Sequence, residues 1–441
     1  MNILITYENF NCGGAESRIF TLSKALIERG HRVIILSKYG DYVPLFNKIG
    51  GIHHTIDFSD ITNLELIINK IREIINIENI EVVHLNPYYS IIAPVFASIY
   101  ENKPFYITIH GIPKNLKDWS ERNSLDFFNY FLENIIFKYS SKIITVSPEV
   151  TEYLIKNFEI EMNKIKYIPQ FIDIELFKNI DYVENKKKKF LLASRIDDDK
   201  ILSINEALNF FSFYKSNIND AELDIVGIGN YREKFEILIN QKNRYFKNNC
   251  IKFLNNKADL WNIINEYDII IGMGRVVLEG IATNKIVILS GIDGIKGVIR
   301  LNNFNKFLKT NFSGRGFLNK SYYEVINEIF KIDEQEILKL KDIVINNFSS
   351  NKWIIEYENI YKKSNIYDFN KDELMKFLED TIEIYIKSKI KVSNELENCK
   401  VELNNIYNSK FWKIISIYYK IKEKFNFLFL KKLNFINRKT K

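Results

Sequence analysis

Cysteine is scarce in this chain, and its three cysteines follow no pattern. Cys12, Cys250 and Cys399 are far apart, and no C-x-x-C spacing occurs. A disulfide framework or a cysteine-based zinc site needs paired cysteines at short, regular spacings. The sequence therefore excludes both classes of protein and indicates a reducing compartment.

Long apolar runs are also missing, and so is a targeting segment at the N-terminus. No run approaches the roughly 18 apolar residues that a membrane-spanning helix needs. The first ten residues, MNILITYENF, lack the basic start and long apolar core of a signal peptide, so we expect a buried strand there. These absences predict a cytoplasmic protein.

Most of the chain lacks a large excess of either positive or negative charge. The formal net charge is +7, but residues 410–441 alone contain nine Lys, one Arg and a single Glu, a local charge of +9. The rest of the chain therefore sums to −2. A nucleic-acid-binding domain spreads its basic residues over one face. We therefore expect a nearly neutral body, a basic tail and no nucleic-acid partner.

What the chain does have is a repeated alternation of short apolar runs with helical patterns. This alternation is typical of βαβ units around a parallel sheet. In the first half we expect a helix over Ala15–Arg29, closed by Gly30. The strands expected there are Ile3–Thr6, Val33–Ser37, Val82–Leu85, Phe105–Ile109, Ile143–Val146 and Ile165–Ile168.

The alternation restarts after a polar stretch, DYVENKKKK (Asp181–Lys189), which we interpret as a solvated linker. The strands expected next are Phe190–Ala193, Leu223–Val226, Ile251–Leu254, Ile269–Ile271 and Ile286–Leu289. At 441 residues the chain is long enough for two α/β domains, each a doubly wound Rossmann-like sheet. The predicted parts are the two domains at 1–178 and 189–349, a helix at 350–365, and a helical basic tail at 370–441.

The stretch DIIIGMGRVVLEG (Asp268–Gly280) carries the clearest chemical pattern. An apolar strand runs into Gly272 and Gly274, which allow a sharp turn and a close approach to a ligand. The helix that follows offers unpaired N–H groups and a positive dipole end, which suit a phosphate. Glu279 lies less than two turns into this helix, where its carboxylate can bind a sugar hydroxyl. The pattern predicts a nucleotide-sugar site.

Two other glycine pairs follow predicted strands. Gly13 and Gly14, in NFNCGGAE, open the first helix, and a purely structural turn is the alternative there. Gly227 and Gly229, in DIVGIGN, precede a helix that begins near Tyr231. Neither pair completes the G-x-G-x-x-G spacing, so a dinucleotide site is not indicated. A nucleotide can still rest over the second turn, and we expect Gly227 and Gly229 to bind the donor.

Among the five histidines, His110 has the best position for chemistry. It ends the strand of ITIHG, and open α/β sheets bind ligands at the carboxyl ends of their strands. His84 also ends a strand and is the main competitor, while a structural role is the alternative for any single histidine. His31 precedes a strand, and we expect His53 and His54 in a polar loop.

The segment SRIDDDK (Ser194–Lys200) places two cations directly after the first strand of the second domain. Arg195 and Lys200 can bracket a pyrophosphate. Its three consecutive aspartates leave two alternatives open, a metal site or simple neutralisation of these cations.

Taken in order, these motifs resemble glycosyltransferase family 4. The matching segments are GGAE, TIHG, IPQFID, SRIDDDK, VGIGNYREKFE and GMGRVVLEG, and they cover roughly residues 1–364. The resemblance implies the GT-B architecture, in which two Rossmann-like domains face each other across a cleft. It also implies a nucleotide-diphosphate sugar as donor, retention of anomeric configuration, and neither a metal nor another cofactor.

The resemblance also assigns roles by position. Arg195 and Lys200 match the cations that hold the donor diphosphate, and Gly13 and Gly14 match the glycine turn beside it. Glu279 matches the second Glu of the family's E-x7-E motif, which binds the nucleotide ribose. A histidine at the position of His110 lies near the donor sugar and the reacting centre, so we expect His110 to be catalytic.

The chain departs from the family pattern at four places. Ile271 stands where the first Glu of E-x7-E is expected, and that carboxylate contacts donor-sugar hydroxyls. Arg275 replaces an apolar residue, and we hypothesise that it contacts the donor phosphate or an acidic sugar. Gln170-Phe171 replaces the common Asn-Gly, and Ser194 replaces a glycine. The departures place the sugar half of the site, more than the nucleotide half, in question.

The basic tail has an amphipathic pattern. On a helix, Lys413, Lys420, Lys424 and Lys431 fall within about 20° of one line, and aromatic and aliphatic residues cluster opposite them. Such a helix binds an anionic membrane surface, and packing on the body or on a partner is the alternative. We expect the tail, 410–441, to place the protein on the inner face of the cell membrane.

The sequence as a whole predicts a retaining glycosyltransferase that transfers a sugar to a glycan or lipid-linked acceptor in cell-surface polysaccharide biosynthesis. One rival is a catalytically silent GT-B subunit that supports a partner glycosyltransferase, and another is a GT-B sugar-nucleotide epimerase. Donor, acceptor, linkage and oligomeric state are not encoded in any pattern that we can interpret.

Overall fold

A computed structural model describes residues 1–59, 63–87, 89–112, 131–177, 187–218, 220–254, 260–363 and 397–402. Both sheets of the protein belong to one compact unit, Met1–Pro113 with Phe131–Lys371. Of the second unit, only residues 397–402, which are helical, are described. Apart from residues 397–402, the expected helical tail at 370–441 lies outside the described residues, as does most of the predicted linker.

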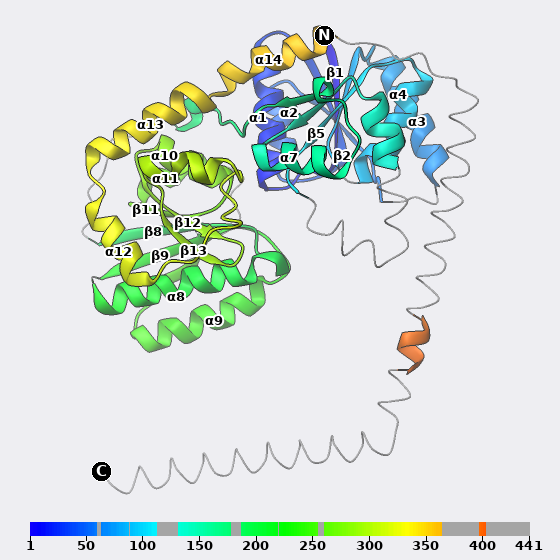
Figure 1. The fold of residues 1–441 in the computed structure, drawn as a ribbon. Helices are drawn as coiled ribbons and strands as arrows, with labels where there is room; N and C mark the ends of the chain where they lie inside the picture. The colour runs from blue at the N-terminus through cyan, green and yellow to red at the C-terminus, as the bar shows by residue number, and fades with distance from the viewer. Residues whose placement is uncertain are drawn as a thin grey trace, which may run out of the picture. The chain divides into compact units, whose positions relative to one another are not determined.

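The first domain carries the labels β1, β2 and β5 in Figure 1. It is built on a seven-stranded parallel sheet in the order β3-β2-β1-β4-β5-β6-β7. Alternate residues of its central strand, such as Ile3 and Ile5, are buried with α1, α2 and α14. The strands are β1 (Asn2–Asn9), β2 (Arg32–Lys38), β3 (Ile52–Thr55), β4 (Val82–Leu85), β5 (Phe105–Ile109), β6 (Lys142–Thr145) and β7 (Ile165–Tyr167). Every strand expected in this half is confirmed.

One element of the first sheet was predicted wrongly. His53 and His54 do not lie in a loop, because they belong to β3 at the edge of the sheet. An edge strand needs less apolar surface than a central one, so IHHT lacks the continuous apolar run that marked the other strands. His53 has its own partner there, with Nε2 2.9 Å from Ser37 Oγ.

The second domain contains six strands rather than the five expected, in the order β10-β9-β8-β11-β12-β13. The additional strand, β13, is antiparallel to β12. Its sequence, GIKGV, has no long apolar run, because glycines and a lysine interrupt it. Gly294 and Gly297 adopt φ of +142° and +112°. The strands are β8 (Lys188–Ala193), β9 (Ala221–Val226), β10 (Ile251–Phe253), β11 (Ile269–Gly272), β12 (Ile286–Gly291) and β13 (Gly294–Val298).

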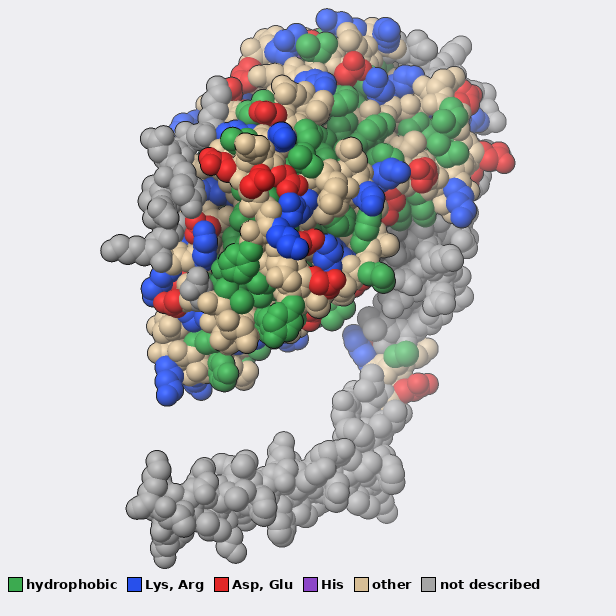
Figure 2. Space-filling model, turned by 60° about the vertical axis from the view of Figure 1, so that its left-hand side comes forward, with side chains coloured by type: hydrophobic (Ala, Val, Ile, Leu, Met, Phe, Trp, Pro, Cys, Tyr) green, Lys and Arg blue, Asp and Glu red, His purple; other side chains and the backbone are tan. Residues whose placement is uncertain are grey.

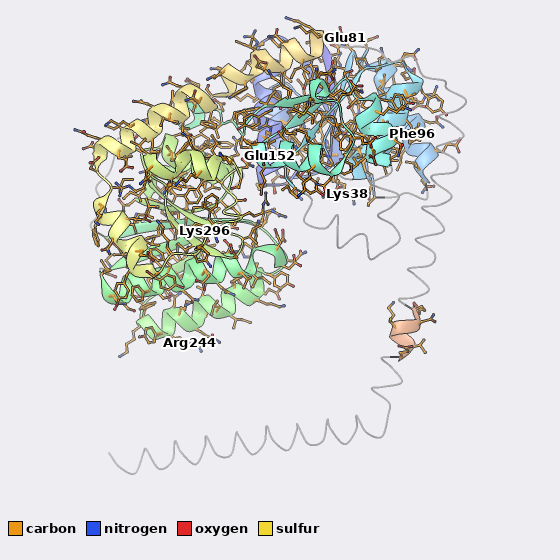
Figure 3. All side chains as sticks on the ribbon, in the orientation of Figure 1. Lys38, Glu81, Phe96, Glu152, Arg244 and Lys296 are labelled. Carbon is orange, nitrogen blue, oxygen red and sulfur yellow. The ribbon has the colours of Figure 1, made fainter. Side chains whose placement is uncertain are left out.

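Two lysines expected in the linker are part of this sheet. Lys188 and Lys189 begin β8, and the backbone N–H of Lys189 donates to Asp268 Oδ2 at 2.9 Å. Another lysine, Lys296 on β13, is 1% exposed. Its Nζ donates to Phe317 O and Asn319 Oδ1, at 2.7 Å each, so its charge is satisfied inside the domain (Figure 3).

Helices cover both faces of the second sheet. Those on one face, α8, α9 and α12, share a hydrophobic core with β8 and β9, and those on the other, α10, α11 and α13, share a second core with β12 (Figure 1). Their bounds, with those of the first domain, are α1 (Gly14–Glu28), α2 (Val43–Lys48), α3 (Leu64–Ile77), α4 (Ile92–Tyr100), α7 (Pro148–Asn157), α8 (Ile201–Asn217), α9 (Arg232–Phe246), α10 (Arg275–Ala282), α11 (Leu301–Leu308), α12 (Tyr322–Lys331), α13 (Glu334–Phe348) and α14 (Ser350–Lys362).

The last described helix of this unit, α14, follows the second domain in sequence but packs on the first. Tyr357 and Tyr361 are buried in the core of the first domain, beside Ile3 and Ile5. A backbone bridge joins Ile172 to Ser349 just before the helix begins. Residues 171–177 and α14 thus connect the two domains at two places in the chain.

No helix within the described residues is long and apolar enough to cross a membrane. The face drawn in Figure 2 mixes Lys and Arg with Asp and Glu, and hydrophobic side chains lie between them. The mixture agrees with the nearly neutral body that the sequence predicts.

Candidate functional site

A cavity of about 620 Å³ is lined by residues of both domains. This volume is in the range of pockets that hold small molecules and cofactors. Strand order reverses beside β1 in the first sheet and beside β8 in the second, and doubly wound sheets bind ligands at such points, outside the carboxyl ends of their strands. The cavity is lined there by Glu8 and Asn9 at the end of β1, His110 after β5, Arg195 after β8 and Met273 after β11.

The N-terminus of α1 forms one wall of this cavity. Gly13 is the N-cap residue, with an extended backbone and no side-chain cap, and Gly14 begins the helix. Both line the cavity together with Glu16 of the first turn. The first N–H groups of a helix have no intrahelical partner, so this wall suits an anion.

Two cations of the second domain, Arg195 and Lys200, line the same cavity as the N-terminus of α1. Arg195 Nη1 is 3.0 Å from Asp197 Oδ2, and Lys200 Nζ is 3.2 Å from Asp199 Oδ2. Lys200 Nζ also lies 3.4 Å from Met273 Sδ, at the glycine turn after β11. Two of the three aspartates, Asp197 and Asp199, are therefore partners of these cations. No group of three or more His, Cys, Asp or Glu suited to a metal occurs among the described residues.

The glycines after β9 position the loop that carries Arg195. Gly227 and Gly229 have φ of +153° and +157°, which only glycine adopts without strain. A Cβ on Gly227 would lie 1.8 Å from Ser194 O, and one on Gly229 would lie 2.2 Å from the backbone of Ile196. Gly227 lines the cavity and Gly229 does not. Their observed role is therefore close packing against residues 194–196.

The two glycines of the turn after β11 also differ, because one lines the cavity and the other does not. Gly274 lines the cavity and is the N-cap residue of α10, with φ of +63°. Gly272 does not line it, and a Cβ there would lie 2.7 Å from Val276 Cγ1. Gly272 thus lets α10 approach β11, while the N-terminus of α10 at Gly274 is the part that lines the cavity.

Arg275 and Glu279 form a buried ion pair at this helix. Arg275 Nε donates to Glu279 Oε1 at 2.6 Å, and the two side chains are 6% and 8% exposed. The same guanidinium donates to Phe171 O at 2.7 Å and to Thr21 Oγ1 at 2.8 Å. Arg275 therefore ties the second domain to α1 and orients the carboxylate expected to bind ribose. Its contact with a donor stays a prediction.

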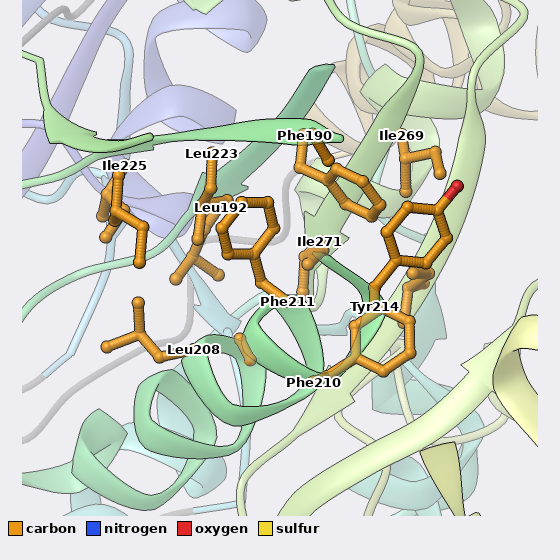
Figure 4. Close-up of a cluster of buried hydrophobic side chains, with 14 of the residues drawn as sticks. Phe190, Leu192, Leu208, Phe210, Phe211, Tyr214, Leu223, Ile225, Ile269 and Ile271 are labelled. Atoms are coloured by element: carbon orange, nitrogen blue, oxygen red, sulfur yellow. The ribbon is translucent and has the colours of Figure 1, made fainter. Parts of the chain in front are cut away.

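Ile271 lies outside the cavity, in the hydrophobic core. It is fully buried in the cluster that includes Leu192, Phe211 and Leu223 (Figure 4). A carboxylate at this position would point into the core instead of toward a sugar. At Ile271, where the family motif has a Glu, the chain is thus part of the buried strand β11.

Asn86 fixes the tautomer and orientation of the His110 ring. The Asn86 amide Nδ2 donates to Thr6 O at 3.2 Å, so its Oδ1 is the atom that accepts from His110 Nε2 at 2.7 Å. This arrangement places the ring proton on Nε2 and leaves Nδ1 as an acceptor. Burial, with smaller contributions from Arg18 and His84, holds the pKa of His110 well below its ordinary value. His110 is therefore suited to accept a hydrogen bond from a hydroxyl.

The competing histidine, His84, has a structural position. It is 1% exposed and lies between Tyr361 and Thr108, with Nε2 2.8 Å from Thr108 Oγ1. Burial lowers the pKa of His84 to about 3, with Arg18 adding to the effect. His84 does not line the cavity.

The family model of Glycosyltransferase Family 4 matches residues 12–176, from the glycine turn of α1 to the connection after β7. The chain carries a family 4 glycosyltransferase domain. The match confirms the predicted family and with it the prediction of a glycosyltransferase. A comparison with curated proteins found no match.

Solved structures confirm the GT-B fold over most of the chain. A glycosyltransferase from Rickettsia africae ESF-5 is 21% identical, with a TM-score of 0.61 over 82% of this chain and 98% of that chain. Anabaena HepE, in complex with UDP-glucose, is 15% identical, with a TM-score of 0.60 over 81% and 99%. A Listeria monocytogenes protein described as a UDP-N-acetylglucosamine 2-epimerase is 13% identical, with a TM-score of 0.54 over 83% and 99%. Such identities establish the fold alone.

Several residues in or beside the cavity escaped the sequence reasoning. Asn86 gave no sign of its contact with His110, because the two are 24 residues apart and meet only through neighbouring strands. Glu16 is an acidic residue in the first turn of a helix, and it belongs to the GGAE motif. That motif predicted a site at this segment but assigned no role to Glu16 itself. Other lining residues that were not predicted include Tyr42, Trp261 and Asn311.

Proposed function

We propose that this chain transfers a sugar, with retention of configuration, from a nucleoside-diphosphate sugar to a glycan or lipid-linked acceptor. One observation carries the proposal. A single cavity gathers the helix N-terminus at Gly13 and Gly14, the cations Arg195 and Lys200, and the neutral His110. An anion-binding wall and two cations suit a diphosphate, and a neutral acceptor beside them suits a sugar hydroxyl.

Each group has a role in this proposal. The C1–O bond of the donor sugar breaks toward the diphosphate, whose growing negative charge Arg195 and Lys200 stabilise. The acceptor oxygen bonds to C1, and its proton passes to an oxygen of the leaving phosphate. Glu279, oriented by Arg275, binds the ribose. His110 holds a donor hydroxyl through Nδ1, and no metal takes part.

The buried Ile271 is the specific observation that favours a rival. Without a carboxylate there, a catalytically silent GT-B subunit that assists a partner glycosyltransferase is the second candidate. The fold by itself does not exclude the epimerase alternative, since HepE and the Listeria protein share it. The family 4 match in the first domain favours transfer over epimerisation.

A donor screen tests the proposed function. We expect one nucleotide sugar from a panel of UDP-, GDP-, ADP- and dTDP-sugars to raise the thermal unfolding midpoint of the full chain, because a ligand at 100 times its Kd stabilises a folded protein by about 2.7 kcal/mol. Liquid chromatography coupled to mass spectrometry of that mixture then separates the candidates, because an epimer keeps the mass of the donor and differs in retention time.

Release of the nucleoside diphosphate with transfer or hydrolysis of the sugar supports a transferase. An isomer of unchanged mass supports the epimerase, and binding without turnover supports the silent subunit. A panel in which no nucleotide sugar moves the midpoint would contradict the donor site itself.

We also propose that the tail, residues 410–441, binds the anionic inner face of the cell membrane, where acceptors for cell-surface polysaccharide are assembled. A basic amphipathic helix with aromatic residues binds such a surface. In flotation with vesicles containing phosphatidylserine, we expect the full chain to rise and a chain lacking residues 406–441 to stay at the bottom. Pure phosphatidylcholine vesicles serve as the control, and equal recovery of both chains on anionic vesicles would refute the proposal.

A further inference from the structure

Glu16 occupies the part of the cavity where an anion would meet α1. Its carboxylate accepts hydrogen bonds from the backbone of Glu16 and Ala15, in the first turn of the helix. It also folds over the N-cap residue, since a Cβ on Gly13 would lie 2.3 Å from Glu16 Oε2. The carboxylate thus satisfies N–H groups that a helix N-terminus otherwise offers to a phosphate.

The surroundings of Glu16 bring its titration close to neutral pH. Burial raises the pKa of Glu16 to about 7, and the backbone hydrogen bonds and Arg195 oppose that rise. The Glu8 carboxylate, at the end of β1, adds to it. Lys200 and the Arg275–Glu279 pair are the other charged groups on the cavity wall. A second negative charge placed beside Glu16 favours its neutral form further.

We propose that Glu16 fills the diphosphate position in the donor-free protein, and that a bound nucleoside diphosphate displaces it as a neutral carboxylic acid. The inference rests on the proposed function and extends it. The same N–H groups cannot serve the carboxylate and a phosphate at once. One proton from the solvent is therefore bound to the Glu16 carboxylate when the diphosphate binds above neutral pH.

The sign of the pH dependence follows from this exchange. Below pH 7 Glu16 is already protonated in the free protein, so the affinity for a diphosphate does not depend on its titration. Above pH 7 the free protein must take up a proton on binding, so the affinity falls, with a limit of about tenfold per pH unit. The second ionisation of a phosphate has a pKa near 6, so UDP itself is fully charged throughout this range.

Isothermal titration with UDP between pH 6.5 and 8.5 tests the inference. Wild-type affinity is expected to fall 10- to 30-fold over that range, and the binding enthalpy to change between PIPES, HEPES and Tris in the amount that uptake of up to one proton gives. Glu16→Gln is expected to bind UDP with a nearly constant affinity and no Glu16-linked proton uptake. Glu16→Ala serves as a second variant should the glutamine fold poorly.

Glu28→Gln is the matched control, because Glu28 lies on the same helix about three turns away and is 55% exposed. It is expected to keep the wild-type pH slope. Equal slopes and equal proton uptake in the wild type and Glu16→Gln would overturn the inference while leaving the donor site intact. Failure of UDP to bind the wild type and both Glu16 variants would overturn the UDP-binding site and this inference together.

Discussion

Replacing Lys200 with alanine is expected to lower turnover of the donor by about 10²–10³-fold, the loss typical when one preorganised donor to a developing charge is removed. Lys200 is 14% exposed, and its ammonium lies between Asp199 and the glycine turn after β11. The charge on a leaving diphosphate grows during bond breaking, so the loss should fall mainly on kcat. Steady-state release of the nucleoside diphosphate, measured with the donor that the screen identifies, checks this expectation.

Lys252→Ala provides the control for this change. Lys252 is an exposed lysine of β10 in the same domain, and it does not line the cavity. We expect its removal to leave both kcat and KM unchanged. A Lys200→Ala enzyme with wild-type kcat would show that this cation takes no part in the departure of the diphosphate.

The second large effect is expected on stability. Arg18→Met should lower the free energy of unfolding by about 3 kcal/mol, because buried acceptors lose their donor. Arg18 is 1% exposed, and its guanidinium donates to the carbonyls of Pro169 and Ile168 at 2.7 and 3.1 Å. It also donates to Tyr357 Oη at 3.0 Å and lies 4.4 Å from the ring centroid of Phe171. Methionine keeps the packing of the stem but supplies no N–H group.

A thermal unfolding scan measures this effect, with an expected drop in the midpoint of roughly 6–12 °C at about 2–4 °C per kcal/mol. Arg232→Met is the comparison variant, since Arg232 forms a partly exposed i,i+4 pair with Glu236 and otherwise lies 5.2 Å from the ring centroid of Phe253. Exposed pairs contribute about 0–1 kcal/mol, so its midpoint should hardly move. Similar midpoints for the two variants would contradict the role of Arg18 as a buried tie between α1, the 168–171 segment and α14.

The sequence was informative about the fold wherever burial on both faces makes a strand apolar throughout. The strands β1, β4, β8 and β11 were visible for this reason. It was uninformative at two of the four sheet edges, although the edge strands β7 and β10 were predicted. β3, with its two histidines, was predicted as a loop, and β13, with its two glycines of positive φ, was not predicted.

In the candidate site, too, the sequence was informative about some residues and uninformative about others. Gly13, Arg195, Lys200 and Gly274, which the short motifs marked, all line one cavity, and their contact with a donor stays a prediction. Gly229 and Gly272 belong to the same motifs but serve packing. A motif identifies a turn, and only the packing around the turn decides which of its residues meets a ligand.

The sequence by itself determined the two doubly wound sheets, the family and the strand ends that carry charge, because these depend on periodicity and on short spacings. The tertiary structure decided the partners. Arg275 meets Thr21 across 254 residues, Asn86 fixes the ring of His110, and Ile271 is enclosed by the core. The reason is physical, since a hydrogen bond or a buried contact acts over a few ångströms in space, and chain distance does not report which residues come that close.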